Sequence, residues 1–304
     1  MSGGAFLGTS DFAARVLDRL AASGHRPSLV VTLPDRRKGR GRREVESPVA
    51  ERATELGIEG LKSDDVNRDS DRERITAASE SAGWASICAF GQLIREPLLS
   101  DAPMLNVHPS LLPRWRGAAP IERAIMAGDD ETGVCVMRLV AGLDSGPVAL
   151  VESTPIGPGE DFGQLSSRLA GIGGDLLVRA LDLAAGERIE WREQDDDEAT
   201  YAEKIERSER EIDPGRTAVE CHDLVRALTP HIGAWVQAGD GRLGVAETRV
   251  EPEVQVPVGA FAEDSGRLLL GCSDAALELL TVRPEGRSEM DAASFIRGYG
   301  LPGG

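Results

Sequence analysis

Asn106, His108 and Asp144 are the residues whose types and spacing are best suited to chemistry. Asn106 and His108 lie two positions apart at the end of the apolar segment 104–108, so in a strand their side chains point the same way. An amide beside an imidazole offers a hydrogen-bond donor to a developing oxyanion and a group that can move protons. The simpler interpretation is that the two side chains only satisfy hydrogen bonds of a turn.

Asp144 stands in a second polar segment, Ala141-Gly142-Leu143-Asp144-Ser145-Gly146, directly after an apolar stretch. A carboxylate flanked by glycines can approach a ligand closely and can keep a neighbouring imidazole protonated. An aspartate in such a turn is usually a turn residue and nothing more. The inference therefore depends on the combination, in a chain that has only four histidines.

The elements that must position these residues alternate between short apolar strands and helices. The pattern predicts strands at 5–7, 28–33, 84–90, 104–108, 132–140 and 148–154. It predicts helices after Ser10 or Asp11, at Pro48 with Ser47 as its cap, and over 72–82, 119–127 and 161–185. Such alternation is typical of an α/β domain with a mostly parallel sheet, in which ligands bind at the carboxyl ends of the strands.

A length of 304 residues favours two domains. We expect a Rossmann-like α/β domain over 1–185 and a polar, acidic linker over 186–205. A small OB-like β-barrel is expected over 206–304, after one helix at 217–228, because short strands there are broken by Gly, Asp-Gly and Pro.

Composition limits the class of protein. The chain is 41% apolar, lacks an apolar run long enough to cross a membrane and begins without the pattern of a secretory signal. Its four cysteines are widely spaced and form no C-x-x-C pair, which argues against a zinc site and for a reducing compartment. We therefore expect a cytoplasmic protein, without a metal and monomeric.

A net charge of -17 argues at first against a nucleic-acid partner. The distribution of charge matters more than the sum, however, and residues 36–43 carry six basic groups in eight positions. This segment is either a solvated loop or a clamp that folds onto an RNA acceptor stem. Its basic residues are Arg36, Arg37, Lys38, Arg40, Arg42 and Arg43.

The segment Asn106-Val107-His108-Pro109-Ser110-Leu111-Leu112-Pro113, together with Gly142-Leu143-Asp144-Ser145-Gly146, resembles the signature of the folate-dependent formyltransferases. Further segments are similar to the members of that family that act on methionyl-tRNA. These are Gly8-Thr9-Ser10-Asp11-Phe12, the basic segment, Ser47-Pro48-Val49, Arg114-Trp115-Arg116-Gly117-Ala118-Ala119-Pro120-Ile121 and Tyr201-Ala202-Glu203-Lys204.

The resemblance implies that Asn106, His108 and Asp144 form a catalytic trio, with 10-formyltetrahydrofolate as donor and the α-amino group of initiator methionyl-tRNA as acceptor. Asn106 and a protonated His108 would stabilise the oxyanion, while Asp144 would sustain the imidazolium and help to position a proton-carrying water. It also implies a folate pocket lined by Phe90, Gly91, Gln92, Leu93, Ser110, Leu111, Leu112, Pro113, Val140 and Ala141. The basic segment and Lys204 would contact tRNA.

Two departures from the family pattern stand out. The segment Phe90-Gly91-Gln92-Leu93-Ile94-Arg95-Glu96-Pro97 is longer before its proline than the usual Tyr-Gly-Leu-Ile-Leu-Pro. Residues 205–304 contain ten Arg against seventeen Asp plus Glu, a net charge of -7, so a tRNA contact there requires a local cluster of arginines.

Three alternatives remain at this stage. A formyltransferase for a sugar nucleotide or another small amine would need neither the basic segment nor the extra domain. A dehydrogenase would need the pattern G-x-G-x-x-G, which Gly3-Gly4…Gly8 does not supply. A non-catalytic RNA-binding protein would leave Asn106, His108 and Asp144 without a purpose.

Overall fold

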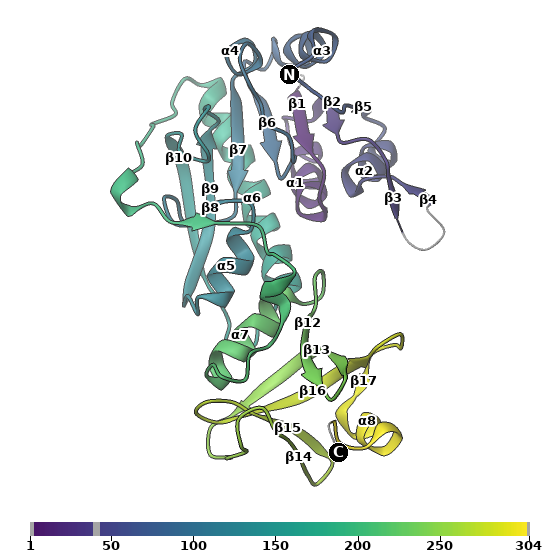
Figure 1. Cartoon of the computed structure of the whole chain (residues 1–304). Helices are drawn as coiled ribbons and strands as arrows, with labels where there is room; N and C mark the ends of the chain where they lie inside the picture. Colours follow the sequence, from purple (N-terminus) through teal and green to yellow (C-terminus); the bar gives the residue numbers. More distant parts are fainter. Residues whose placement is uncertain (1–2, 39–42, 303–304) are drawn as a thin grey trace. The chain divides into compact units, whose positions relative to one another are not determined.

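The structure is a computed structural model that describes residues 3–38 and 43–302 (Figure 1). The chain divides into two compact units. The first comprises Met1–Gly117, Thr132–Thr154 and Ser166–Tyr201, and the second comprises Ala118–Glu131, Pro155–Leu165 and Ala202–Gly304. Two short segments that interrupt the first unit along the sequence are thus part of the second unit.

The first unit is built on a seven-stranded sheet in the order β10-β9-β7-β6-β1-β2-β5 (Figure 1). Its strands are β1 (Gly3–Gly8), β2 (Pro27–Thr32), β5 (Glu59–Lys62), β6 (Ala85–Cys88), β7 (Met104–His108), β9 (Glu131–Arg138) and β10 (Val148–Pro155). The pairs β1–β2, β1–β6, β2–β5 and β6–β7 are parallel, and β9 runs antiparallel to β7. The prediction of an α/β unit with a mostly parallel sheet is confirmed.

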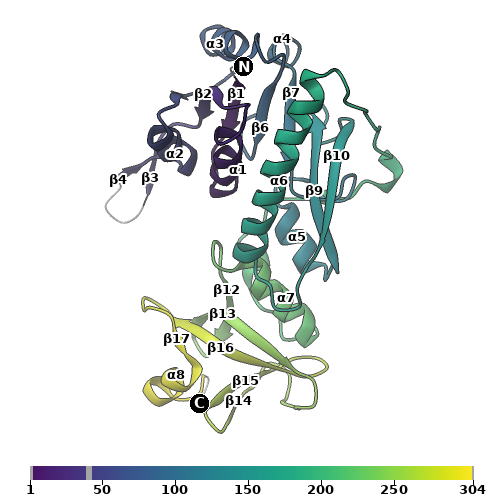
Figure 2. The ribbon, with the colours of Figure 1, turned by 180° about the vertical axis from the view of Figure 1, so that it is seen from behind.

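Helices flank this sheet, and α6 (Phe162–Ala185) crosses one face of it (Figure 2). A Cβ added at Gly173 of α6 would lie 2.7 Å from Cγ1 of Val107 on β7, so this glycine permits the close approach. The other helices of the unit are α1 (Asp11–Ala21), α2 (Pro48–Leu56), α3 (Asp69–Ser79) and α4 (Leu98–Asp101). Two short ribbons, β3 (Arg36–Lys38) with β4 (Arg43–Val45) and β8 (Arg116–Gly117) with β11 (Tyr201–Ala202), complete the pairings.

The predicted helix starts at Ser10 and Ser47 are confirmed. Ser10 caps α1 by accepting a hydrogen bond from the backbone N–H of Ala13, and Ser47 caps α2 in the same way from Ala50. Each cap satisfies a backbone donor that the first turn of a helix leaves without a partner. The short strand β5 and the β3–β4 ribbon were not predicted, because neither carries an apolar run.

The second unit contains a six-stranded antiparallel sheet in the order β12-β13-β16-β15-β14, with β17 paired to β16. The strands are β12 (Ala234–Ala238), β13 (Gly241–Glu251), β14 (Phe261–Asp264), β15 (Arg267–Gly271), β16 (Ala276–Pro284) and β17 (Met290–Asp291). Helices α5 (Pro120–Met126), α7 (Ala218–Leu228) and α8 (Ala292–Tyr299) accompany it. Apolar side chains of α7 pack with alternate residues of β12, β13, β15 and β16, which lie on one face of the sheet, and form one core with them. A separate small β-rich unit is confirmed.

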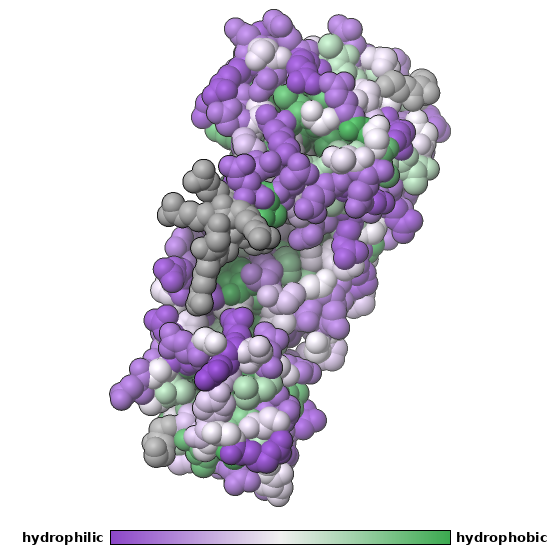
Figure 3. Space-filling model, turned by 90° about the vertical axis from the view of Figure 1, so that its right-hand side faces the viewer, coloured by the Kyte–Doolittle hydropathy of each residue, from purple (hydrophilic) through white to green (hydrophobic). Residues whose placement is uncertain are grey.

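The face drawn in Figure 3 is mostly hydrophilic, with small and separate apolar patches, as expected for a chain with 28% charged residues. No helix in the described part of the chain combines the length and apolar character that a membrane crossing requires.

Candidate active site

Strand β7 carries Asn106 and His108 to the carboxyl end of the sheet. Both side chains are largely buried, with 8% and 5% of their residue surface exposed. Asn106 is paired in register with Ile87 of the parallel strand β6, and His108 lies opposite Cys135 of the antiparallel strand β9. A short strand with a neighbour on each side holds both residues at fixed positions.

Asp144 completes the cluster from the turn between β9 and β10. Its Oδ2 lies 3.6 Å from Nδ1 of His108, and its Oδ1 lies 3.4 Å from Nδ2 of Asn106. The backbone N–H of Gly117 donates a hydrogen bond of 2.9 Å to Oδ2 of the same carboxylate. The three residues singled out from the sequence are therefore neighbours in space.

The second ring nitrogen of His108 also faces an acceptor. Nε2 lies 3.0 Å from the backbone carbonyl oxygen of Trp115. A carbonyl can only accept a hydrogen bond, so Nε2 must carry a proton, while the carboxylate of Asp144 favours a proton on Nδ1. Both ring nitrogens of His108 thus face an oxygen that can only accept a hydrogen bond.

Cys135 lies opposite His108 in the sheet but is not a nucleophile. Burial raises the pKa of its thiol to about 11. The thiol donates a hydrogen bond of 3.0 Å to the backbone carbonyl of Ser110. Because the thiolate is the reactive form of cysteine, this residue has a packing role.

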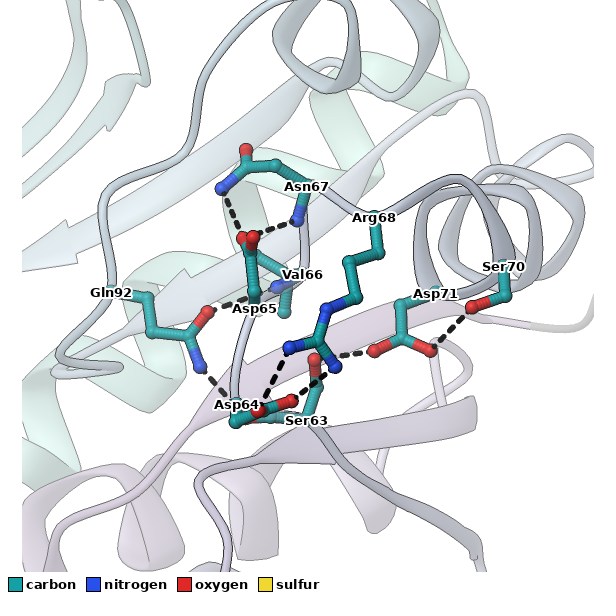
Figure 4. Close-up of polar contacts among 9 residues, drawn as sticks. All are labelled: Ser63, Asp64, Asp65, Val66, Asn67, Arg68, Ser70, Asp71 and Gln92. Carbon is teal, nitrogen blue, oxygen red and sulfur yellow. Dashed lines mark hydrogen bonds and ion pairs between the residues drawn. The ribbon is translucent and has the colours of Figure 1, made fainter.

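The segment 90–93, which is predicted to line the folate pocket, is hydrogen-bonded to the segment 63–67 (Figure 4). Nε2 of Gln92 donates to the carbonyl of Ser63 at 2.7 Å, and its Oε1 accepts from the N–H of Val66 at 3.0 Å. Nδ2 of Asn67 donates to the carbonyl of Leu93 at 3.0 Å. The amide of Gln92 is thus engaged by the protein's own backbone, whereas the side chain of Leu93 is 62% exposed.

The other residues predicted to bind folate differ in how much of their surface is exposed. Phe90 is 3% exposed and packs within the core of the sheet. Ser110 is fully buried, and its hydroxyl donates to the carbonyl of Arg114 at 2.7 Å. Gly91, Leu111, Leu112, Pro113, Val140 and Ala141 are at least partly exposed.

Sequence reasoning missed the backbone groups of the site. The carbonyl of Trp115 and the N–H of Gly117 contact His108 and Asp144, but every residue carries such groups and no side-chain pattern reveals which ones are used. Among residues 3–38 and 43–302, no group of three or more His, Cys, Asp or Glu is arranged to hold a metal ion.

The basic segment is partly described. Residues 36–38 and 43–45 pair as an antiparallel ribbon, with Arg37 opposite Glu44 and Lys38 opposite Arg43. Arg40 and Arg42, both predicted to bind tRNA, lie outside the described residues. Lys204, in the second unit, is exposed.

A pocket of about 780 Å³ lies wholly within the second unit. Half of the ten arginines of residues 205–304 line it: Arg207, Arg210, Arg242, Arg283 and Arg287. The guanidinium of Arg242 lies over the ring of Trp235, with Cζ 4.0 Å from the ring centre. Within the described part of the chain, none of the five forms an ion pair with a carboxylate, although Glu211 and Glu285 also line the pocket. In a unit with excess negative charge, such a concentration of cations fits an anionic ligand.

Comparisons with known proteins agree along the whole chain. Residues 4–181 match the family model described as "Formyl transferase", and residues 204–300 match "Formyl transferase, C-terminal domain". A protein of Jannaschia sp. named methionyl-tRNA formyltransferase is 42% identical over 296 residues, covering 96% of this chain and 95% of the relative. A protein of Ruegeria pomeroyi with the same name is 39% identical over 307 residues, covering 98% of each.

Solved structures share the fold at low identity. An N-formyltransferase from Helicobacter canadensis, in complex with folinic acid and dTDP-3-aminofucose, superposes with a TM-score of 0.68 at 15% identity, covering 92% of this chain and 99% of that one. HypX from Aquifex aeolicus, in complex with tetrahydrofolic acid, gives a TM-score of 0.62 at 16% identity, covering 96% of this chain and 46% of that one. At such identities the likeness is one of fold alone.

Proposed function

The chain belongs to the formyl transferase family, and from that premise we propose that it transfers a formyl group from 10-formyltetrahydrofolate to the α-amino group of initiator methionyl-tRNA. The observation that carries the proposal is the meeting of Asn106, His108 and Asp144 at the end of β7. The identity of about 40% over nearly the full length of relatives named methionyl-tRNA formyltransferase supports this acceptor over a sugar amine.

The residues present fit a ligand with a developing oxyanion. Nδ2 of Asn106 forms one hydrogen bond within the described part of the chain, to Asp144, so its second proton is left for a ligand oxygen. His108 is the second donor, through Nδ1, because Nε2 is engaged by the carbonyl of Trp115 while the nearest acceptor to Nδ1, Oδ2 of Asp144, is 3.6 Å away. Donors held in place before the reaction stabilise charge without a cost of reorganisation when it develops.

In the proposed mechanism the neutral amine of the acceptor attacks the formyl carbon. Asn106 and His108 donate hydrogen bonds to the carbonyl oxygen as it gains negative charge. Asp144 keeps the imidazole of His108 charged and accepts a hydrogen bond from a water that takes up the amine proton. The bond between the formyl carbon and N10 of the folate then breaks, and N10 receives that proton, so that tetrahydrofolate leaves. Cys135 is a neutral thiol, so no covalent enzyme intermediate is part of this mechanism.

The folate would lie along the loops at the carboxyl ends of β6 and β7. Gly91, Leu93, Leu111, Leu112 and Pro113 offer backbone and apolar surface, and Val140 and Ala141 follow β9. The contacts of Gln92 with Ser63 and Val66 support a role in shaping that loop.

Two surfaces are proposed to contact the tRNA. One is the basic segment 36–43, and the other is the arginine pocket of the second unit, with Arg207, Arg210, Arg242, Arg283 and Arg287 facing phosphates and Trp235 offering a ring on which a base can stack. This pocket supplies the local cluster of arginines that the net charge of residues 205–304 made necessary. The proposed acceptor implies a cytoplasmic enzyme, and a monomer remains our prediction.

A direct assay tests this function. Purified protein, 10-formyltetrahydrofolate and charged initiator methionyl-tRNA should yield formylmethionyl-tRNA, whereas a dTDP-amino sugar should not be formylated. Replacing Arg36, Arg37, Lys38, Arg40, Arg42 and Arg43 by Ser should raise the KM for tRNA and leave that for the folate unchanged. Formylation of the sugar amine in place of the tRNA would contradict the proposed acceptor.

A further inference from the structure

Asp144 has an unfavourable backbone conformation that contacts from other segments of the chain must stabilise. Its φ is +45°, in the left-handed region that residues other than glycine seldom adopt. The turn that contains it, between Arg138 and Val148, has no regular secondary structure of its own. Since this conformation aims the carboxylate at His108, whatever stabilises the turn also sets the geometry of the site.

The side chain of Gln194, about 50 residues later in the sequence, forms hydrogen bonds to this turn. Its Nε2 donates to the backbone carbonyl of Asp144 at 2.8 Å and to that of Gly146 at 2.7 Å. A side-chain amide has two N–H groups, so both are used on the two carbonyls that bracket the turn.

The orientation of the Gln194 amide is determined by its partners. Oε1 accepts a hydrogen bond of 3.0 Å from Nε of Arg116. Carbonyl oxygens only accept and a guanidinium only donates, so exchanging the amide N and O would place like groups against each other at all three contacts. The amide therefore has one orientation that satisfies its neighbours.

Arg116 is itself immobilised. It is 3% exposed, and its Nη2 donates to Oδ1 of Asp196 at 2.7 Å. Its backbone N–H donates to the carbonyl of Thr200 at 2.8 Å, and the next residue, Gly117, donates to the carboxylate of Asp144. Arg116 thus contacts Gln194, which bonds to the backbone of Asp144, while the adjacent Gly117 contacts the carboxylate of Asp144.

The segment that carries Gln194 is also paired with the strand after the turn. Arg192 and Val148 exchange two backbone hydrogen bonds, of 2.8 and 2.9 Å. Although residues 186–205 resemble a linker in composition, residues 192–200 lie against the turn of Asp144 and the strand β8.

We propose that Gln194 is a positioning residue for formyl transfer, which holds the Asp144 turn so that its carboxylate faces His108; this rests on the function proposed above. The amide of Gln194 is engaged by Arg116, Asp144 and Gly146, so this residue acts through Asp144. Its loss therefore lowers kcat and leaves both KM values nearly unchanged.

The test compares the wild type with Gln194→Glu and Gln194→Ala. Gln194→Glu keeps an oxygen for Arg116 but loses both donors to the turn. We expect about a tenfold lower kcat for either variant, KM values within about twofold, and no further loss when Gln194→Ala is added to Asp144→Ala. Gln255→Glu is the matched control, because Gln255 is an exposed glutamine in the second unit that donates to the carbonyl of Asp274. An unchanged kcat, or a loss that adds to that of Asp144→Ala, would overturn the proposal.

A second readout does not depend on activity. The ring signals of the four histidines can be followed by NMR in the whole protein. Gln194→Glu should shift those of His108 alone, because His25, His222 and His231 bond instead to Asp182, Thr248 and Glu122. His108 signals at wild-type positions would refute the positioning role. If the wild type formylates no tRNA but His108 shifts in Gln194→Glu, the proposed function fails and the positioning role stands.

Discussion

The imidazole of His108 and the carboxylate of Asp144 lie 3.6 Å apart, Nδ1 to Oδ2, although one ends a strand and the other stands in a turn after another strand. The far nitrogen of the imidazole faces the carbonyl of Trp115. His108 is therefore held between two acceptors, and one of them is presented by the turn that carries Asp144.

Replacing His108 by Ala should lower kcat by about 10²–10³-fold, because one preorganised donor to the oxyanion is lost. The effect is measured as single-turnover formylation of methionyl-tRNA. His25→Ala is the control, since His25 bonds to the exposed Asp182 away from this cluster and should leave kcat unchanged. Full activity of His108→Ala would remove His108 from the mechanism.

Replacing Arg283 and Arg287 by Ser should weaken tRNA binding and reduce the slope of log Kd against log salt by about 1–2. The double variant Arg216→Ser with Arg297→Ser removes the same charge from exposed positions of the same unit that do not line the pocket. Affinity is measured by filter binding over a series of salt concentrations. Equal effects of the two double variants would show that the pocket has no special role.

Loss of the ion pair between Arg123 and Glu209 should make the second unit less stable in acid. Arg123 donates to both carboxylate oxygens, at 2.6 and 3.1 Å, and these hydrogen bonds lower the pKa of Glu209. A lowered pKa in the folded state means that the stabilisation is present above the pKa of the unfolded chain and is lost as the pH falls through that of the folded state.

Glu209→Gln should accordingly reduce the free energy of unfolding at pH 7, by up to about 1 kcal/mol for a partly exposed pair. The difference from the wild type should disappear as the pH is lowered below the ordinary range of a glutamate. Urea unfolding at several pH values measures it, with the exposed Glu253→Gln as control. A difference that persists unchanged in acid would contradict the assignment.

Cys135 should resist alkylation in the native protein. Its side chain is fully buried, and a pKa of about 11 leaves about one thiolate in a thousand at pH 8. Iodoacetamide followed by peptide mass spectrometry should find this cysteine unmodified in the native protein and modified in guanidinium. Rapid native labelling with loss of activity would reopen the question of a covalent mechanism.

The sequence by itself determined the class of the first unit and most of its elements. Met104–His108 is a strand as predicted, because a buried strand is a short apolar run, and Ser10 and Ser47 cap helices because their hydroxyls satisfy free N–H groups. The placement of Asn106 and His108 on the same face of the strand also follows from the sequence, since residues two apart in a strand point the same way.

Only the tertiary structure decided what surrounds them. The carbonyl of Trp115, the N–H of Gly117 and the amide of Gln194 reach the site through contacts between distant segments, and such contacts leave no local pattern. The same holds for the arginine pocket. Its five arginines are spread over residues 207–287 of an acidic domain. The pairing of β13 with β16 brings Arg242 and Arg283 to one surface, and Arg210 reaches it through hydrogen bonds to the carbonyls of Ile232 and Gly233.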